Sequence, residues 1–367
     1  MASVDRYRDG WRARWRTPDG HQRSKVFARK LDAHRHLAGV EHAKLTGGYV
    51  DPQAGRVTFE SYTVDWAARQ MWRPSTADAY AAAFARVFPV IGGRPLAQLR
   101  TSELQALVKV LADRLAPSTV EATYRAVAAV LKAAVTDRVL TSSPATVVKL
   151  PRADRPRVQP LELADVHGLA DAMPERARAA VMFAAGSGLR MGETLGLTTD
   201  RVDWLRRTVR VDRQMVTPSM GSPRFGPPKT KASHRTVPVA QVTLDAVAAH
   251  LARWPADGSG LVFTNIRGEP WRRGTFCELI RDAREVAGLP SSVTFHDLRH
   301  HFASVLIAAG CSIKAVQEAL GHANASETLD TYSHLWPADE DRIRDAVQAL
   351  HGASGVTSVS EAGGTTL

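Results

Sequence analysis

The chain has 367 residues, a net charge of +11 and an apolar content of 44%. This length indicates two or three domains, each large enough to bury a core. The positive charge favours a polyanionic partner, which on charge alone can be DNA, RNA or a membrane surface. There is no long apolar run and no hydrophobic signal core, so we expect a soluble, cytoplasmic protein. Two cysteines, Cys277 and Cys311, exclude a disulfide framework and a cysteine-based metal site.

Residues 1–56 are expected to form a small basic module, with 12 Lys or Arg against 6 Asp or Glu. Aromatic and basic residues alternate over residues 11–15, which predicts a half-exposed strand. The turn Pro18-Asp19-Gly20 leads to a second strand over residues 23–27, and a helix is predicted over residues 31–45. A solvated strand face is an equally good interpretation of this charge. The candidate DNA contacts of the module are Arg12, Arg14 and Arg23.

Residues 57–150 are expected to be helical. The pattern predicts helices over residues 58–71 and 75–88, the second of them after Pro74. Two capping boxes predict the starts of two further helices. These boxes pair Ser102 with Gln105 and Ser118 with Glu121. The segment therefore predicts a small helical bundle.

Residues 151–160 are predicted to be a linker, because three prolines exclude regular structure there. Its arginines suit passage along a phosphate backbone, and Arg155 and Arg157 are candidate DNA contacts. A larger mixed domain is predicted over residues 161–350. The Gly/Ser/Thr-rich tail at residues 351–367 is predicted to be disordered.

Helices and a strand pair are predicted in the first part of residues 161–350. The helices cover residues 175–185, 241–252 and 273–287, and the strands cover residues 208–216 and 234–239. The whole chain is therefore predicted to be mainly α, with small β-sheets.

Chemically distinctive side chains gather in residues 296–334. His296 and Arg299 are three residues apart and share one face of a predicted helix that Gly310 ends. A second short helix is predicted to end at Gly321, which would hold His322 on a turn rather than bury it in the middle of an element. Tyr332 follows ten residues later. A guanidinium, two imidazoles and a phenol brought together by such turns suit a phosphate group.

A metal site is the sharper alternative for the same segment. His296 and His300 are four residues apart, in a superficial imitation of the zinc motif H-E-x-x-H. That motif needs a glutamate where Asp297 stands, and Arg299 would place a cation beside the metal. We therefore expect neither a metal nor another cofactor.

These residues resemble the C-terminal signature of the tyrosine recombinases, the phage integrase family. The signature comprises H-x-x-R, then L-G-H, then a tyrosine at this interval. It also requires an upstream Gly-Leu-Arg turn followed by an acidic residue, and Gly188-Leu189-Arg190 with Glu193 matches it. The glycines imitate a dinucleotide loop, but a predicted helix rather than a strand precedes them.

The resemblance implies a catalytic role for six residues. Tyr332 would attack a phosphodiester to form a 3′-phosphotyrosine, with His296 as its base. Arg190 and Arg299 would hold the non-bridging oxygens, with a donor from His322. Glu193 would orient the site.

The sixth residue is a lysine of a β-hairpin, which in this family protonates the leaving 5′-hydroxyl. Lys229 matches it by its place in the P-K-T pattern, and Lys231 is the alternative. Taken without the family, a pair of loop lysines is ordinary solvated charge.

The resemblance also extends to the other segments. Residues 1–56 resemble the arm-binding module of phage integrases, which has three strands and a helix, and residues 57–150 resemble the core-binding domain. A helix predicted over residues 338–350 would either correspond to the helix that docks on a neighbouring protomer or pack on its own domain. In that case the partner is double-stranded DNA with attachment-type sites, bound by a homotetramer, with possible host DNA-bending and directionality factors.

The function implied is site-specific recombination of DNA, which integrates or excises a mobile element without metal or ATP. Two alternatives remain open. One is a type IB topoisomerase-like activity, which shares the chemistry but does not pair two DNA sites. The other is a catalytically silent DNA-binding protein of the same fold.

Overall fold

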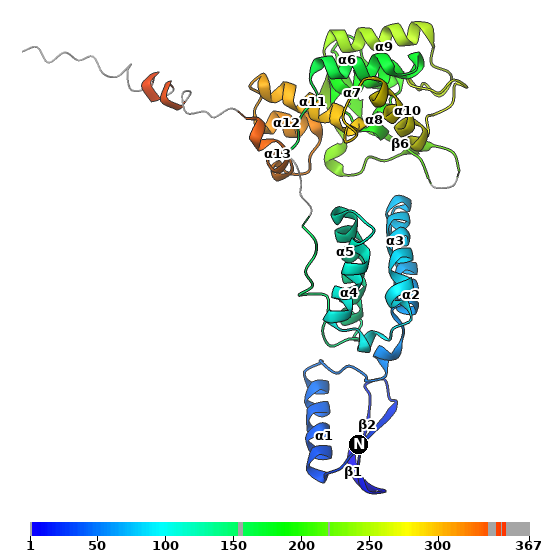
Figure 1. Ribbon diagram of the computed structural model, residues 1–367, viewed down its shortest axis with the longest axis vertical. Coiled ribbons are helices and arrows are strands. Elements are labelled where there is room, and N and C mark those ends of the chain that lie inside the picture. Colours follow the sequence, from blue (N-terminus) through cyan, green and yellow to red (C-terminus); the bar gives the residue numbers. More distant parts are fainter. Residues whose placement is uncertain (1, 153–156, 219–220, 337–342, 346, 350–367) are drawn as a thin grey trace, which may run out of the picture. The chain divides into compact units, whose positions relative to one another are not determined.

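The computed structural model describes residues 2–152, 157–218, 221–336, 343–345 and 347–349 (Figure 1). The chain divides into two compact units, Met1–Arg155 and Pro156–Leu367. Two hydrophobic cores lie in the first unit and one in the second. Helices dominate and the sheets are small and antiparallel, so the predicted mainly α fold with small β-sheets is confirmed.

The N-terminal part of the first unit is a three-stranded antiparallel sheet covered by one helix (Figure 1). Its strands are β1 (Ser3–Tyr7), β2 (Gly10–Arg16) and β3 (Gln22–Phe27), in that order across the sheet, and α1 spans Lys30–Leu45. Side chains of a strand alternate between its faces. Ala13 and Trp15 are therefore buried together against Leu37 of α1, while the intervening arginines face away.

The rest of the first unit is a helical bundle. Its helices are α2 (Phe59–Ala68), α3 (Pro74–Val87), α4 (Thr101–Ala112) and α5 (Pro117–Thr136), with short turns η1 (Ala54–Arg56), η2 (Phe88–Gly92) and η3 (Leu96–Gln98). The predicted caps at Ser102 and Ser118 are wrong. α4 begins one residue before Ser102, with Glu103 accepting from the Arg100 N–H, and α5 begins at Pro117, whose fixed φ suits a first helical position.

The second unit is built around α7 (Glu175–Ser187). This helix packs against α6 (Leu163–Ala172), α9 (Gln241–Arg253) and α11 (Phe295–Ala308). Its many alanines let the neighbouring helices approach closely, and Phe183 fills the centre of the core with no exposed surface. The remaining helices before α11 are the short α8 (Met191–Leu195) and α10 (Arg273–Val286).

Two small antiparallel sheets border this helical core. One has the order β4-β5-β8, with β4 (Val202–Asp203), β5 (Thr208–Val211) and β8 (Arg235–Pro238), after the turn η4 (Thr199–Arg201). The other pairs β6 (Gln214–Val216) with β7 (Arg224–Gly226), and the turn η5 (Lys231–Ser233) precedes β8. The strand predicted over residues 208–216 is thus broken between β5 and β6.

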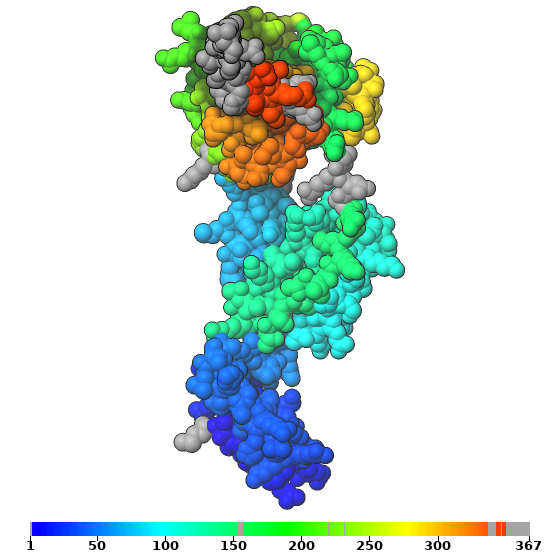
Figure 2. All heavy atoms as spheres, turned by 90° about the vertical axis from the view of Figure 1, so that its left-hand side faces the viewer, coloured from blue at the N-terminus to red at the C-terminus, as the bar shows by residue number. Residues whose placement is uncertain are grey.

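The C-terminal part of the second unit contains α12 (Ile313–Leu320), α13 (Ala325–Tyr332) and the turn η6 (Ser333–Leu335). Figure 2 shows these elements, in orange, as one area of the surface of this unit. Residues 343–345 and 347–349 are helical, whereas the rest of the predicted helix 338–350 and the tail 351–367 lie outside the described residues. In the described part of the chain, no helix has the length and apolarity to cross a membrane.

Candidate active site

The first arginine of the site lies where α7 passes into α8. Gly188 ends α7 with a φ of +64°, and a Cβ there would lie 2.3 Å from the Phe302 ring. Only glycine fits this turn without strain. The turn places Arg190 at the N-cap of α8, where its N–H donates to Glu193 Oε2 at 3.1 Å and its Nη1 donates to Oε1 at 3.2 Å. The predicted Gly-Leu-Arg turn with its acidic partner is therefore present as a local unit.

Arg299 is the second arginine and is almost fully buried, with 2% exposure. It donates from Nη1 to the Gly188 carbonyl at 2.8 Å and from Nη2 to the Leu320 carbonyl at 2.6 Å. These bonds connect α11 to the ends of α7 and α12. Burial, followed by the charges of Arg190 and Arg235, lowers the pKa of Arg299 to about 9, so it stays charged at neutral pH.

A third arginine, Arg235 on β8, was missed by the sequence analysis. Its Nη2 donates to Glu193 Oε2 at 3.0 Å, and its Nε donates to the Ala319 carbonyl at 2.8 Å. Burial acts to raise the pKa of Glu193, but Arg235 and Arg190 outweigh this effect and the pKa falls below its usual value. The signal for Arg235 in the sequence was its position two residues before Val237, a core residue of the same strand.

His322 follows α12, whose last turn ends at Gly321 with a φ of +67°. His322 lies on the predicted turn rather than within a helix, and its side chain is buried there, with 7% exposure. Its Nδ1 hydrogen-bonds Thr328 Oγ1 at 2.8 Å, and its Nε2 lies 3.7 Å from Glu327 Oε1. Burial, then Arg299 and Arg190, lower the pKa of His322 to about 3, so its ring is neutral at pH 7.

Tyr332 is the last residue of α13 and is 1% exposed. Burial raises its pKa to about 12, although the nearby positive charges of Arg299 and Arg190 act in the opposite direction. Its hydroxyl is 2.7 Å from Nδ1 of His300. His296 was predicted to be the base for Tyr332, and His300 was considered only as a zinc ligand. The structure places His300, and not His296, in hydrogen-bond contact with the phenol.

His296 lies in the first turn of α11, whose N-cap Thr294 accepts a hydrogen bond from the His296 N–H at 3.3 Å. Its ring meets the ring of His300 edge-on, with centroids 4.8 Å apart. Desolvation, then His300 and Arg299, lower the pKa of His296 to about 4. His296 is nevertheless an exposed residue. Because its pKa is lowered, the ring is neutral at pH 7.

The two candidate lysines lie between β7 and β8. Lys229 is exposed on this loop, and in the described part of the chain no hydrogen bond or ion pair ties it to the arginines. The side chain of Lys231 lies outside the described residues. Ser233, at the end of the same segment, is 3.4 Å from Arg190 Nη1, so the loop reaches the border of the site.

The geometry therefore gathers Arg190, Arg299, His322 and Tyr332 with Glu193 and Arg235, while His296 is at the edge and Lys229 is outside. Three guanidinium groups face one carboxylate, which leaves a surplus of positive charge and of N–H donors. Such a set suits a phosphate or a pentacoordinate phosphorane. Among the described residues, no group of three or more His, Cys, Asp or Glu side chains is placed to hold a metal ion.

The candidate DNA-binding arginines of the first unit are already paired with carboxylates. Arg12 and Arg14 both bind Asp5, at 2.7 and 3.0 Å, on the sheet face away from α1. Arg23 lies opposite Trp15 on the other face and binds Asp51 at 2.6 Å. The three therefore do not share a face. In the linker, Arg157 is exposed, whereas Arg155 lies outside the described residues.

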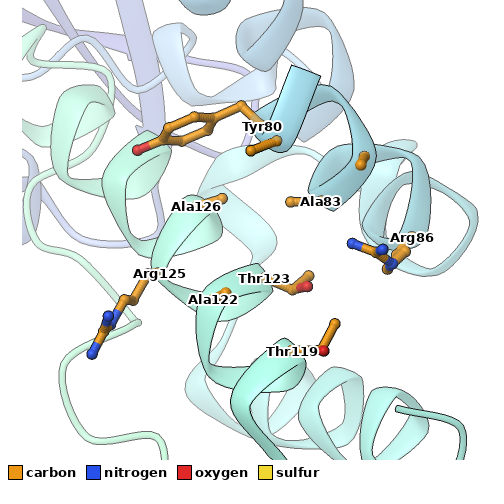
Figure 3. Close-up of a pocket in the computed structure, with 10 residues that line it drawn as sticks. Tyr80, Ala83, Arg86, Thr119, Ala122, Thr123, Arg125 and Ala126 are labelled. Atoms are coloured by element: carbon orange, nitrogen blue, oxygen red, sulfur yellow. The ribbon is translucent and has the colours of Figure 1, made fainter. Parts of the chain in front are cut away.

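A hollow of about 430 Å³ lies between α3 and α5 in the first unit. Figure 3 shows that small side chains such as Ala83, Ala122 and Ala126 line it. Arg86 and Arg125 lie at its borders (Figure 3). All of its lining residues belong to the first unit, and its hydroxyl groups come from Tyr80, Thr119 and Thr123.

Comparison with known proteins assigns the chain to a family. The profile of the phage integrase family matches residues 160–338, and the profile of the phage integrase central domain matches residues 59–150. A XerC-like tyrosine recombinase of Caldanaerobacter subterraneus is 31% identical over 196 residues, which are 48% of this chain and 49% of that protein. A XerD recombinase of Pseudomonas aeruginosa is 29% identical over 59% of this chain and 68% of that protein. The chain thus spans about half the length of the first relative.

Solved structures show the same fold. The Tn1549 transposon integrase, solved in complex with transposon right end DNA, has a TM-score of 0.69 at 21% identity and covers 80% of this chain and 100% of that chain. A lambda integrase dimer bound to a core site has a TM-score of 0.61 at 17% identity and covers 91% and 96%. With two family profiles over most of its length, the chain belongs to the phage integrase family of tyrosine recombinases.

Proposed function

We propose that this protein is a site-specific DNA recombinase of the phage integrase type, which cuts and rejoins double-stranded DNA through a 3′-phosphotyrosine. The observation that carries the proposal is the position of Tyr332. Its buried phenol lies in the field of Arg299 and Arg190, two cations whose charge lowers its pKa against the effect of burial. A nucleophile beside a cluster of guanidinium donors is the arrangement that metal-free phosphoryl transfer needs.

The roles of the binding residues follow from their contacts. Arg190 and Arg299 bind the non-bridging oxygens, with charge surplus supplied by Arg235. His322 is neutral and buried, so it acts as a hydrogen-bond donor to the same oxygens rather than as a cation. His296 contacts the phosphate from the open edge of the site, and Glu193 orients Arg190.

The leaving 5′-oxygen receives its proton from Lys229, or from Lys231 in its place. The exposed position of Lys229 on a loop is compatible with a lysine that joins the site when DNA is bound. Cleavage conserves the phosphodiester energy in the phosphotyrosine, so strand rejoining requires neither ATP nor a metal.

We further propose a modular organisation for DNA binding. Residues 1–56 bind arm-type sites, residues 57–150 bind the core site, and residues 161–350 carry the chemistry, with residues 151–160 as a linker along the DNA and 351–367 as a tail. The outward Arg12 and Arg14 support the first assignment, because they exchange Asp5 for phosphate at little cost.

The proposed assembly is a homotetramer on paired attachment sites of a phage or other mobile element, acting on the nucleoid in the bacterial cytoplasm. A lambda integrase tetramer bound to a Holliday junction is among the similar structures, with a TM-score of 0.56. Host DNA-bending and directionality factors would select integration or excision.

The test uses a nicked duplex that contains a candidate attachment core, incubated with the full-length protein in EDTA. A covalent protein–DNA band on a denaturing gel is expected for the wild type and absent for Tyr332→Phe. Tyr80→Phe is the matched control, because in the described residues its hydroxyl has no hydrogen-bond partner, and it should retain the band.

Two duplexes in one reaction then separate the alternatives. Recombinant products establish a recombinase, whereas relaxation of supercoiled plasmid without strand exchange indicates a topoisomerase-like enzyme. If DNA is retarded on a native gel but no adduct forms across a library of sites, the protein is a silent DNA-binding relative and the proposal is wrong.

A further inference from the structure

His300 is a half-buried titratable residue that has no role in the mechanism proposed above. It follows Arg299 on α11, and its Nδ1 lies 2.7 Å from the hydroxyl of Tyr332 on α13. The two rings meet edge-on, with centroids 5.5 Å apart. We propose that His300 is a catalytic residue that accepts the phenolic proton of Tyr332 during DNA cleavage. This inference rests on the proposed function.

The hydrogen bond has a preferred direction. Tyr332 is 1% exposed, and within the described residues His300 is the partner of its hydroxyl. A buried hydroxyl proton needs an acceptor, and Nδ1 can accept when the ring carries its proton on Nε2. The half-buried ring of His300 leaves Nε2–H able to donate to water. With the opposite tautomer, the hydroxyl proton of Tyr332 would be buried without an acceptor.

The phenol requires such an acceptor. Its pKa is raised to about 12, mainly by burial, so almost none of it is ionised at neutral pH. His300 is neutral there, because burial lowers its pKa. A neutral imidazole that already holds the phenolic proton in a hydrogen bond is suited to take it as the Oη–P bond forms.

The imidazolium formed in this way has a counterion. The Asp297 carboxylate, one turn earlier on α11, acts to raise the pKa of His300, against burial and Arg299. It is held in place by the N–H and hydroxyl of Thr294. The charged and titratable groups around the His300–Tyr332 pair are His296, Asp297 and Arg299 on α11, Glu327 on α13, and Arg190 before α8.

The position of His300 next to Arg299 keeps the base and the phosphate ligand on one rigid helix. His296 offers no such contact, since it reaches the phenol only through the ring of His300.

During cleavage, one bond to phosphorus replaces another and two protons move. The Oη–P bond forms while the P–O5′ bond breaks, the phenolic proton moves to Nδ1 of His300, and the leaving O5′ takes a proton from the loop lysine. In strand rejoining the 5′-hydroxyl gives its proton to the loop lysine as the O5′–P bond forms, the Oη–P bond breaks, and His300 returns its proton to Oη.

The kinetic test compares His300→Asn, His300→Phe and the control His167→Asn, an exposed histidine of α6. The substrate is a duplex with a bridging 5′-phosphorothiolate at the cleavage position, whose thiolate leaves without a general acid. We expect the single-turnover rate of adduct formation to fall about 10²- to 10⁴-fold in both His300 variants. The rate of the wild type should level off above the pKa of His300. The rate of His300→Asn should keep rising with pH, because only ionised phenol then attacks.

An unchanged rate and pH profile in His300→Asn would overturn the proposal. So would faster cleavage by His300→Phe, which would mean that the hydrogen bond only restrains the nucleophile. If the wild type forms no adduct at Tyr332 on any DNA, the proposed function fails and this role fails with it.

A measurement without DNA distinguishes a failure of the role proposed for His300 from a failure of the proposed function. The ¹⁵N NMR spectrum of histidine-labelled protein at neutral pH, assigned by the loss of one signal in His300→Asn, reports which ring nitrogen carries the proton. We expect Nδ1 of His300 to be unprotonated. Its ¹⁵N chemical shift should change in Tyr332→Phe. A proton on Nδ1 would show that His300 donates to the phenol, and would overturn the proposal whatever the DNA results.

Discussion

The carboxylate of Glu193 lies between the guanidinium groups of Arg190 and Arg235, with its side chain 2% exposed. A buried charge of this kind is tolerated only while its partners are present. Arg235 thus holds in place the carboxylate that Arg190 contacts, so under the proposed function the position of Arg190 depends on Arg235.

Arg235→Met tests this dependence. Removing one partner of a buried pair costs about 3–5 kcal/mol of unfolding free energy, with the lower end expected here because Arg190 remains beside Glu193. The double variant Arg235→Met with Glu193→Gln should recover part of that loss, since no uncompensated charge remains. Urea unfolding of the two single variants and the double variant measures the coupling. A loss below about 1 kcal/mol in Arg235→Met would mean that the pair behaves like a surface ion pair.

His322 makes the stability of the second unit depend on pH. Its pKa is about 3 in the folded protein against 6.5 for a free histidine. The unfolded chain therefore binds a proton that the folded one excludes, so the contribution of His322 is complete above pH 6.5 and is lost as pH falls toward 3. We expect the unfolding free energy to drop by about 2 kcal/mol more in the wild type than in His322→Gln between pH 7.5 and 5. Equal drops in urea titrations would contradict the buried, neutral state of His322.

The site could be predicted from the sequence as far as helical spacing and turns determine it. Helical spacing identified the shared face of His296 and Arg299, whereas the local Arg190–Glu193 unit was identified through the resemblance to the family signature. The contact between His300 and Tyr332 joins α11 to α13, and its partner depends on how these helices pack. Helical spacing places both His296 and His300 near Arg299 and does not select between them.

At the scale of elements, glycines set the ends of the helices that carry the site. Gly188 combines a positive φ of +64° with a Phe302 ring atom 2.3 Å from the position of an added Cβ. Gly310, after α11, has a φ of +77° with open space around it. A comparison of alanine substitutions at Gly188 and Gly310 therefore separates two free-energy costs, that of the left-handed backbone and that of the clash with Phe302.

Gly188→Ala should therefore destabilise the protein more than Gly310→Ala. Both variants lose about 1–2 kcal/mol for the left-handed backbone, and Gly188→Ala loses about 1–3 kcal/mol more for overpacking. Because the Gly188 carbonyl accepts from Arg299, adduct formation should fall only in Gly188→Ala. Thermal unfolding and the adduct assay on both variants provide the comparison. Equal losses of stability would show that Phe302 moves aside without cost.

Element boundaries were the weaker part of the prediction. Most helices lie within a few residues of their predicted ranges because apolar spacing identifies them. The predicted strand over residues 208–216 is instead two short strands. The break falls at Asp212 and Arg213, which are committed to ion pairs with Arg201 and Asp200. Such side-chain pairing joins residues that are 11 and 13 positions apart in the sequence, and it leaves no periodic signal.

At the scale of the whole molecule, the charge of +11 is consistent with DNA binding but does not identify a surface for it. Many of the arginines are paired with carboxylates, as Arg12 and Arg23 are. Net charge therefore supports DNA as the partner. To identify the contact residues, one must also know which face of a strand or helix each arginine lies on. The chain folds as two compact units, whose hydrophobic cores are separate.

Because the two units share no hydrophobic core, a core substitution should affect the unfolding of one unit only. Leu131 of α5 and Leu169 of α6 are both fully buried, in the cores of the first and second unit. Truncation of either leucine to alanine costs about 2–5 kcal/mol. For units of this size, that corresponds to a midpoint lower by roughly 5–15 °C. Calorimetry of Leu131→Ala and Leu169→Ala should show the lower transition in different units, identified by limited proteolysis at each midpoint. A single transition lowered equally by both variants would mean that the two units unfold together, and that the linker of residues 151–160 couples rather than separates them.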